Sequence, residues 1–179
     1  MTSEQGQKVV VERIFISPGH DFRGRHGSER RSHVVETSEN VELVAGSGIV
    51  GDRFFDYQPD FKGQITFFDR KVWEEVKQEF GIPNLCPSRF RRNVLLTGAD
   101  LNSLIGKRFS LGDLEFTGSE EATPCYWMDE ACAADGDFPE GKVSGVEQFL
   151  KGKGGVRCRI LRGGFLCLGE HQLSLMGAI

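Results

Sequence analysis

The tripeptide Thr-Pro-Cys at positions 123–125 places a thiol where it could bind a metal ion. Pro124 fixes its own φ angle and keeps Thr123 extended, so Cys125 follows the end of a predicted strand on a stiff backbone. Carboxylates nearby disfavour the thiolate that a reactive cysteine needs; they are Glu120, Glu121, Asp129 and Glu130. A functional Cys125 therefore requires basic groups from elsewhere in the fold. The alternative is a buried cysteine before an amphipathic helix over residues 125–134.

Such basic groups occur where predicted loops meet predicted strands, often beside glycine. Arg53 follows Gly51-Asp52, and Arg157 follows Gly154-Gly155. Glycine lets a backbone approach a ligand closely, and a guanidinium pairs with phosphate or carboxylate. The pattern indicates an anion pocket; its candidates are Asp52, Arg53, Arg91, Arg92, Asn93 and Arg157. The alternative for each arginine is a solvated side chain or an ion pair with one of the 26 acidic residues.

A third candidate is the polar segment 17–27, which contains His20, Asp21 and His26. These side chains are potential metal ligands or anion contacts, although a flexible polar loop explains the same residues equally well. The glycine-rich stretches match neither a P-loop nor the dinucleotide-binding fingerprint. The chain also lacks the nucleophile elbow of a serine hydrolase.

Composition narrows the class of protein. The 179 residues are enough for one domain with a real core, and the net charge of −4 argues against a nucleic-acid partner. The apolar stretches are far shorter than the roughly 20 residues of a membrane span, and the first eight residues lack a signal peptide's apolar region. We therefore expect a cytoplasmic protein.

The five cysteines show no C-x2-C spacing. This predicts free thiols rather than disulfides or structural zinc, with Cys158 and Cys167 buried in strands.

The elements that must position these residues are mostly strands. Residues 1–8 are predicted to be flexible, and residues 9–179 to form a single domain. Alternation and β-branched residues predict strands over residues 9–16, 40–45, 64–68, 92–97, 108–111 and 114–117, followed by a meander of 156–161, 165–168 and 171–175. Asp69 predicts the start of a helix that Gly81 ends, and Ser144 with Glu147 predicts a capping box. Without a βαβ rhythm, the pattern favours a β-barrel or sandwich with two or three inserted short helices.

Taken in order, several of these pieces resemble the MOSC domain, a module named for the C-terminal region of molybdenum-cofactor sulfurases and also found in small stand-alone proteins. The resemblance spans most of the chain. It is carried by Gly48-Ile49-Val50-Gly51-Asp52-Arg53, Gln64-Ile65-Thr66, Arg91-Arg92-Asn93, Gly98-Ala99-Asp100-Leu101-Asn102, Thr123-Pro124-Cys125 and Gly154-Gly155-Val156-Arg157. Two positions depart from the family pattern: Thr123 replaces an acidic residue, and Lys62-Gly63-Gln64 replaces a Gly-Gly-Pro stretch.

The resemblance implies a mostly β, pyruvate-kinase-barrel-like fold and a function for Cys125. This cysteine either ligates the molybdenum of a pterin cofactor or carries sulfane sulfur, and a soft thiolate suits both roles. The cofactor's phosphate would lie on Arg53, Arg91, Asn93 and Arg157, with Asp52 beside them and with Arg92, His20 and His26 as weaker candidates. Pyridoxal phosphate is not expected, because it belongs to a separate domain of the sulfurases for which this chain has no room.

Three functions follow as expectations. The first is the reduction of small N-hydroxylated compounds on a molybdenum-pterin cofactor, with electrons from a separate reductase because the chain has no flavin or iron-sulfur motif. The second is a sulfur carrier in which Cys125 holds a persulfide received from a cysteine desulfurase. The third is a non-enzymatic anion-binding barrel in which Cys125 is inert.

Overall fold

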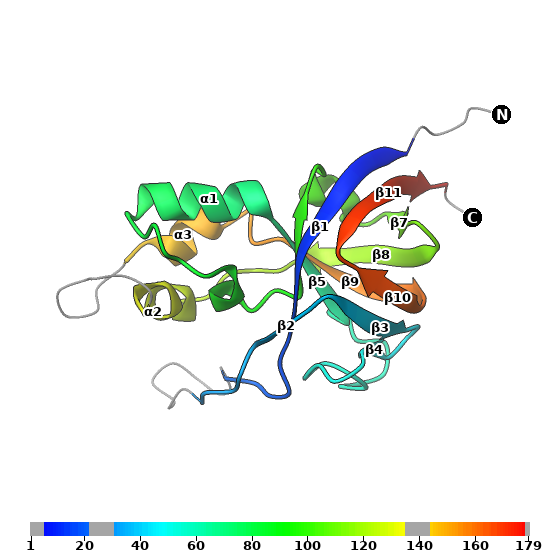
Figure 1. The fold of residues 1–179 in the computed structure, drawn as a ribbon, viewed down its shortest axis with the longest axis horizontal. Coiled ribbons are helices and arrows are strands. Elements are labelled where there is room, and N and C mark those ends of the chain that lie inside the picture. Colours follow the sequence, from blue (N-terminus) through cyan, green and yellow to red (C-terminus); the bar gives the residue numbers. More distant parts are fainter. Residues whose placement is uncertain (1–5, 22–30, 135–143, 178–179) are drawn as a thin grey trace.

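The computed structural model describes residues 6–21, 31–134 and 144–177, and it shows a β-barrel with helices gathered at one end (Figure 1). The strands are β1 (Gln7–Ile16), β2 (Glu36–Ser38), β3 (Asn40–Val44), β4 (Gly48–Ile49), β5 (Ile65–Asp69), β6 (Val94–Thr97), β7 (Arg108–Leu111), β8 (Leu114–Glu121), β9 (Val156–Arg162), β10 (Gly164–Cys167) and β11 (Gly169–Met176). The helices are α1 (Arg70–Glu79), α2 (Trp127–Ala133) and α3 (Val146–Leu150), with 3-10 turns η1 (Pro87–Phe90) and η2 (Leu101–Leu104).

Seven strands close the barrel in the order β11-β7-β8-β9-β5-β6-β1, because β1 pairs with both β6 and β11. β2 extends the sheet beyond β1, and β10, β3 and β4 form a separate three-stranded sheet. The predicted β-barrel is therefore confirmed. β1 begins at Gln7, two residues earlier than the alternation predicted.

The predicted C-terminal meander is wrong. β9 pairs with β5 and β8, β10 with β3, and β11 with β1 and β7, so none of the three strands pairs with the next. Gly164 (φ 143°) and Gly169 (φ 113°) turn the chain out of one sheet and into another instead of closing tight hairpins. Local sequence pattern marks strands but does not select partners that lie far apart in the chain.

The helix after Asp69 forms as predicted, and the Asp69 carboxylate accepts a hydrogen bond from the backbone N–H of Lys71 at 2.8 Å. Val72 and Val76 bury its inner face. This helix connects β5 to β6, which pair in parallel. The chain thus contains a βαβ unit that its sequence pattern did not predict.

The predicted capping box at the start of α3 does not form. Gly145 (φ 99°) occupies the N-cap position instead of Ser144, and glycine has no side chain that could cap the helix. The backbone N–H of Val146 donates to Asp129 Oδ1 of α2 at 2.6 Å. A carboxylate from the preceding helix therefore caps α3 and ties the two helices together.

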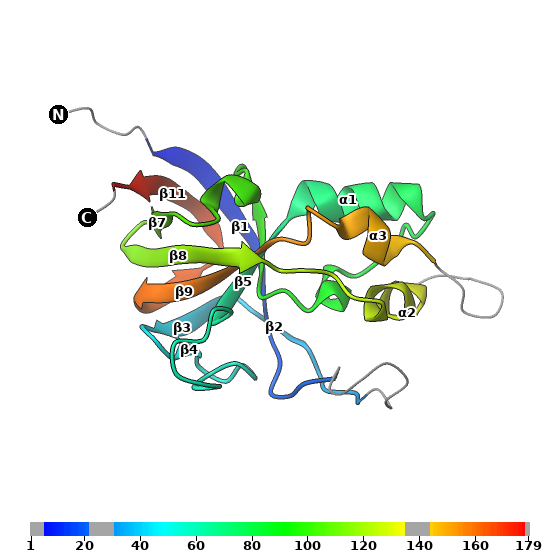
Figure 2. The same ribbon diagram turned by 180° about the vertical axis from the view of Figure 1, so that it is seen from behind.

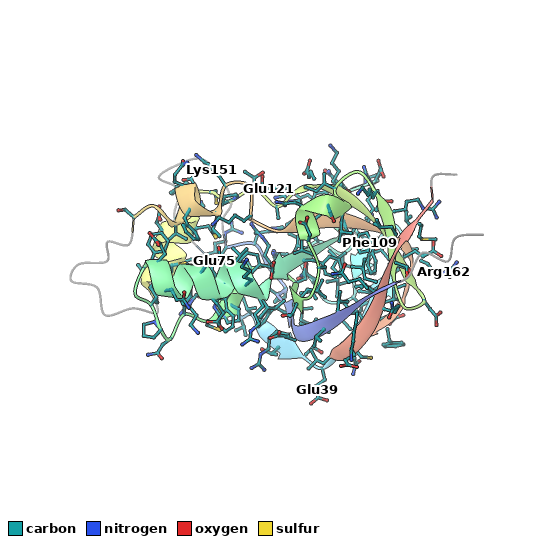
Figure 3. All side chains as sticks on the ribbon, turned by 90° about the horizontal axis from the view of Figure 1, so that it is seen from above. Glu39, Glu75, Phe109, Glu121, Lys151 and Arg162 are labelled. Carbon is teal, nitrogen blue, oxygen red and sulfur yellow. The ribbon has the colours of Figure 1, made fainter. Side chains whose placement is uncertain are left out.

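Two apolar cores support this arrangement. One fills the barrel, where Phe109 lies inside the ring of strands and stacks on Phe116 at 5.3 Å between ring centroids (Figure 3). The other lies beneath the helices and includes Phe68, Phe90 and Met128. In the described part of the chain, no helix has both the length and the apolar character of a membrane span.

Candidate functional site

A cavity of about 150 Å³ lies where the barrel meets the helices, and it is lined by segments far apart in the sequence. They are the β1–β2 connection, the loop between β4 and β5, β5 itself, the residues that precede β6, the segment between β8 and α2, the first turn of α2, and the start of β9. Figure 2 shows the chain crossing this junction as it runs from β8 to α2. The cavity thus collects residues that only the closed barrel brings together.

Cys125 lines the cavity from the segment between β8 and α2, and its side chain is exposed. The residue before it, Pro124, is buried. The carbonyl of Cys125 accepts the backbone N–H of Met128 at 2.9 Å, and this bond forms the start of α2. The Gly154-Gly155 pair packs against the strand end before this segment, because a Cβ on Gly154 would lie only 2.3 Å from the Ala122 carbonyl oxygen. The glycines therefore position the strand end that carries Cys125.

Four arginines line the same cavity: Arg53, Arg91, Arg92 and Arg157. The guanidinium of Arg92 donates to three backbone carbonyls, those of Phe90 at 3.1 Å, Ala122 at 2.7 Å and Gly154 at 3.0 Å. The pKa of Arg92 is lowered to about 10, mainly by burial and also by the charges of Arg157 and Arg53, while Cys125 and Glu121 oppose the shift. The cations of the cavity therefore lie close enough to repel one another.

Arg53 and Arg91 also donate hydrogen bonds to other groups of the protein. Arg53 donates to the Arg91 carbonyl at 2.9 Å, and burial lowers its pKa against the opposing charges of Asp52 and Asp21. Arg91 adopts a left-handed backbone (φ 51°) and donates to Asp21 Oδ2 at 2.6 Å and Ser17 Oγ at 3.0 Å. These two arginines fix the cavity wall as well as its charge.

Asp52 and Asn93 lie beneath the cavity and are not among its lining residues. Asn93 Oδ1 accepts from the Thr66 hydroxyl at 2.9 Å, and its amide donates to Asp52 Oδ2 at 3.3 Å. Asp52 also accepts the backbone N–H of Ser17 at 3.1 Å. The cofactor contact that the resemblance implied for both residues stays a prediction; in the structure their polar atoms join the ends of β1, β5 and β6 to one another.

An aromatic wall faces the arginines, and the sequence patterns above did not identify it. His20, Phe54 and Phe61 line the cavity, and Tyr57 packs behind them. The Phe54 ring lies 4.8 Å from that of His20 and 5.0 Å from that of Phe61, and the Arg53 guanidinium lies 4.7 Å above it. The available signal was the group of aromatic residues between the predicted strands over 40–45 and 64–68, because large aromatic side chains are usually packed.

The predicted metal site in segment 17–27 gains no support. His26 lies outside the described residues, Asp21 is bonded to Arg91 and His33, and His20 belongs to the aromatic wall. Within residues 6–21, 31–134 and 144–177, no group of three or more His, Cys, Asp or Glu side chains converges as a metal site. Asp21 is instead an ion-pair partner at the cavity edge.

All five cysteines are free thiols, but their exposure differs. Cys158 is buried as predicted, whereas Cys167 is exposed, contrary to the prediction, because β10 turns it to the outer face. Burial raises the pKa of the Cys158 thiol.

We expect iodoacetamide to alkylate Cys125 and Cys86 much faster than Cys158, because only the first two thiols are exposed and alkylation needs the thiolate. Peptide mass spectrometry after timed quenching measures each rate. Cys86, which is exposed but does not line the cavity, is the matched reference. Equal, slow reaction of Cys125 and Cys158 would indicate that Cys125 is inert.

Comparison with known proteins identifies the fold. The structure is similar to that of YuaD from Bacillus subtilis, with a TM-score of 0.73 and 21% identity over 95% of this chain and 97% of that one. It is also similar to YiiM from Geobacillus stearothermophilus (TM-score 0.63, 14% identity, 94% and 75% of the two chains). YiiM from Escherichia coli gives a TM-score of 0.59 and 17% identity over 97% and 71%.

A search of curated proteins found no match. The family model of the MOSC domain, in contrast, matches residues 23–171, which is most of the sequence and includes Cys125 and the four arginines of the cavity. The chain therefore belongs to the MOSC domain family.

Proposed function

We propose that the protein binds a molybdenum-pterin cofactor, with the Cys125 sulfur as a ligand of the metal and the arginines as partners of the phosphate. The observation that carries this proposal is that the Cys125 thiol and four guanidinium groups line one cavity. No short stretch of the chain holds both kinds of group, so their meeting is a property of the fold.

The residues of the cavity fit such a ligand in their chemistry. A thiolate is a soft donor that suits molybdenum, guanidinium groups pair with phosphate, and the rings of Phe54 and Phe61 offer faces to a flat heterocycle. At about 150 Å³, the cavity is smaller than the 300–1,000 Å³ or so that enclose a whole drug-sized ligand. It therefore suits the anionic or metal-bearing part of a cofactor rather than all of it.

When bound, the cofactor would supply two-electron redox chemistry. The reaction that we propose converts an N-hydroxylated compound, two electrons and two protons into the parent amine-type compound and water. A separate reductase supplies the electrons. Within this scheme, Arg92 holds the segment that carries Cys125 through the Ala122 carbonyl, and Arg53 and Arg91 fix the opposite wall.

Metal analysis of the purified protein tests the proposal. The protein is purified from a host that makes the cofactor, under reducing and oxygen-poor conditions, and molybdenum is measured by mass spectrometry. We expect molybdenum in proportion to protein, and reduction of an amidoxime when a suitable reductase is added. Protein without molybdenum after such a purification would contradict the proposal.

A second candidate function, a sulfur carrier, is favoured by the exposed position of Cys125 in the cavity. In that case a cysteine desulfurase transfers sulfur to Cys125 and no cofactor remains bound. Intact-mass measurement would then show one added sulfur atom on Cys125 that dithiothreitol removes. If the protein bound only simple anions and carried neither molybdenum nor a persulfide, the third function, a non-enzymatic binding module, would be indicated.

A further inference from the structure

The four arginines of the cavity differ in how they are held. Arg53, Arg91 and Arg92 donate to backbone carbonyls or to nearly buried carboxylates. Arg157 is 37% exposed, and among the described residues its ion pair is with Glu120, at 3.3 Å between Nη1 and Oε1. Arg157 is therefore the cavity arginine best placed to exchange its partner for a ligand.

Glu120 lies at the edge of the cavity between two cations. It stands opposite Arg157 in the β8–β9 ladder, next to an irregularity between Gly118 and Glu120, and its second oxygen lies 3.6 Å from Lys62 Nζ. The neighbouring carboxylate of Glu121 has a different task, because it accepts the backbone N–H groups of Gly152 and Gly154. Glu120 is thus the acidic residue before Cys125 that pairs with a cavity arginine, Arg157, and with Lys62 just outside the cavity lining.

The charges around the cavity favour an anion. Among the described residues that line it, four guanidinium groups face the single carboxylate of Asp21, which is already bonded to Arg91 and His33. The pKa of Arg92 is lowered mainly by burial, and the nearby charges of Arg157 and Arg53 lower it as well. Free sulfate, a dianion, and free phosphate, which carries between about one and two negative charges near neutral pH, would therefore be attracted to the site and would cover Cys125.

We infer that Glu120 is a specificity-determining residue that keeps free inorganic oxyanions out of the cavity by competing with them for Arg157 and Lys62. The inference rests on the proposed function, because it concerns which anion reaches the same site. A tethered carboxylate competes at a high effective concentration. A phosphate that belongs to a larger ligand has further contacts with the cavity and outcompetes Glu120, whereas a free oxyanion has only its charge.

The test uses the full-length, cofactor-free protein and inorganic phosphate. Phosphate is titrated by calorimetry at constant ionic strength, and in parallel its protection of Cys125 against iodoacetamide is measured. We expect Glu120→Gln to raise the affinity for phosphate about fivefold, as removal of a competing, partly exposed ion pair predicts. The phosphate concentration that protects Cys125 should fall by the same factor.

Two variants separate this effect from general charge and from misfolding. Glu75→Gln is the matched control, because the Glu75 side chain is 37% exposed, close to the 40% of Glu120, and it pairs with two cations, Lys71 and Lys153, that do not line the cavity. We expect it to leave phosphate affinity unchanged. Arg157→Gln should weaken phosphate binding, and adding Glu120→Gln to it should raise the affinity less than it does in the wild type, because only Lys62 then remains to be released.

Unchanged phosphate affinity in Glu120→Gln would overturn the inference. An equal gain in Glu75→Gln would also overturn it, since the effect would then follow net charge alone. The phosphate titrations do not depend on molybdenum. If the purified protein held no molybdenum, the proposed function would be contradicted, but the titrations would still test the role of Glu120.

Discussion

Replacing Cys125 with serine should leave a folded protein that no longer retains molybdenum. A hydroxyl oxygen is a harder and weaker donor to this metal than a thiolate. Loss of groups that merely orient a metal ligand costs about 10–100-fold in affinity or activity, so loss of the ligand itself should cost more than about 100-fold. Metal analysis and amidoxime reduction with a fixed reductase measure the two effects.

The matched control is Cys86→Ser. Cys86 is also exposed and precedes η1, but it does not line the cavity. We expect this variant to retain molybdenum and activity. Equal molybdenum in the Cys125→Ser and Cys86→Ser proteins would show that the metal, if bound, takes its protein ligand from elsewhere.

The second large effect concerns the ion pair at the cavity edge. Asp21 and Arg91 have side chains that are only 4% and 8% exposed, and their atoms lie 2.6 Å apart. Removing one partner of a buried pair leaves an uncompensated charge, which costs about 3–5 kcal/mol. We therefore expect Asp21→Asn to lower the free energy of unfolding by about 3 kcal/mol, as measured by urea denaturation.

Asp60→Asn is the control for this prediction. Asp60 also pairs with an arginine, Arg159, at 2.6 Å, but its side chain is 79% exposed. Exposed pairs contribute about 0–1 kcal/mol, so this variant should unfold close to the wild type. A loss of similar size in both variants would contradict the claim that burial makes the Asp21–Arg91 pair important.

Local sequence patterns were sufficient for the elements but not for their partners. Asp69 and Gly81 marked the two ends of α1, and alternation predicted the strands that pair as β7 and β8. The pairing of β11 with β1 joins opposite ends of the chain, and no local pattern encodes it. The cap of α3 failed for the same reason, because its carboxylate comes from Asp129 on another helix.

The candidate site was predictable in its residue types but not in their roles. Cys125 and the arginines could be named from the sequence, whereas Asp52 and Asn93 turn out to be buried supports. The acidic residues near Cys125 were expected to oppose its ionisation. In the fold, Glu120 pairs with Arg157, Glu121 accepts backbone N–H groups and Asp129 caps α3, so tertiary contacts decide which partner each carboxylate has.

The most direct test of the account is to locate the metal relative to Cys125. Crystals of protein purified with its metal are measured on both sides of the molybdenum absorption edge, and the anomalous difference map gives the position of molybdenum. We predict a peak within bonding distance of Cys125 Sγ, inside the cavity that the four arginines line. A molybdenum peak away from that sulfur would contradict the assignment of Cys125 as the metal ligand.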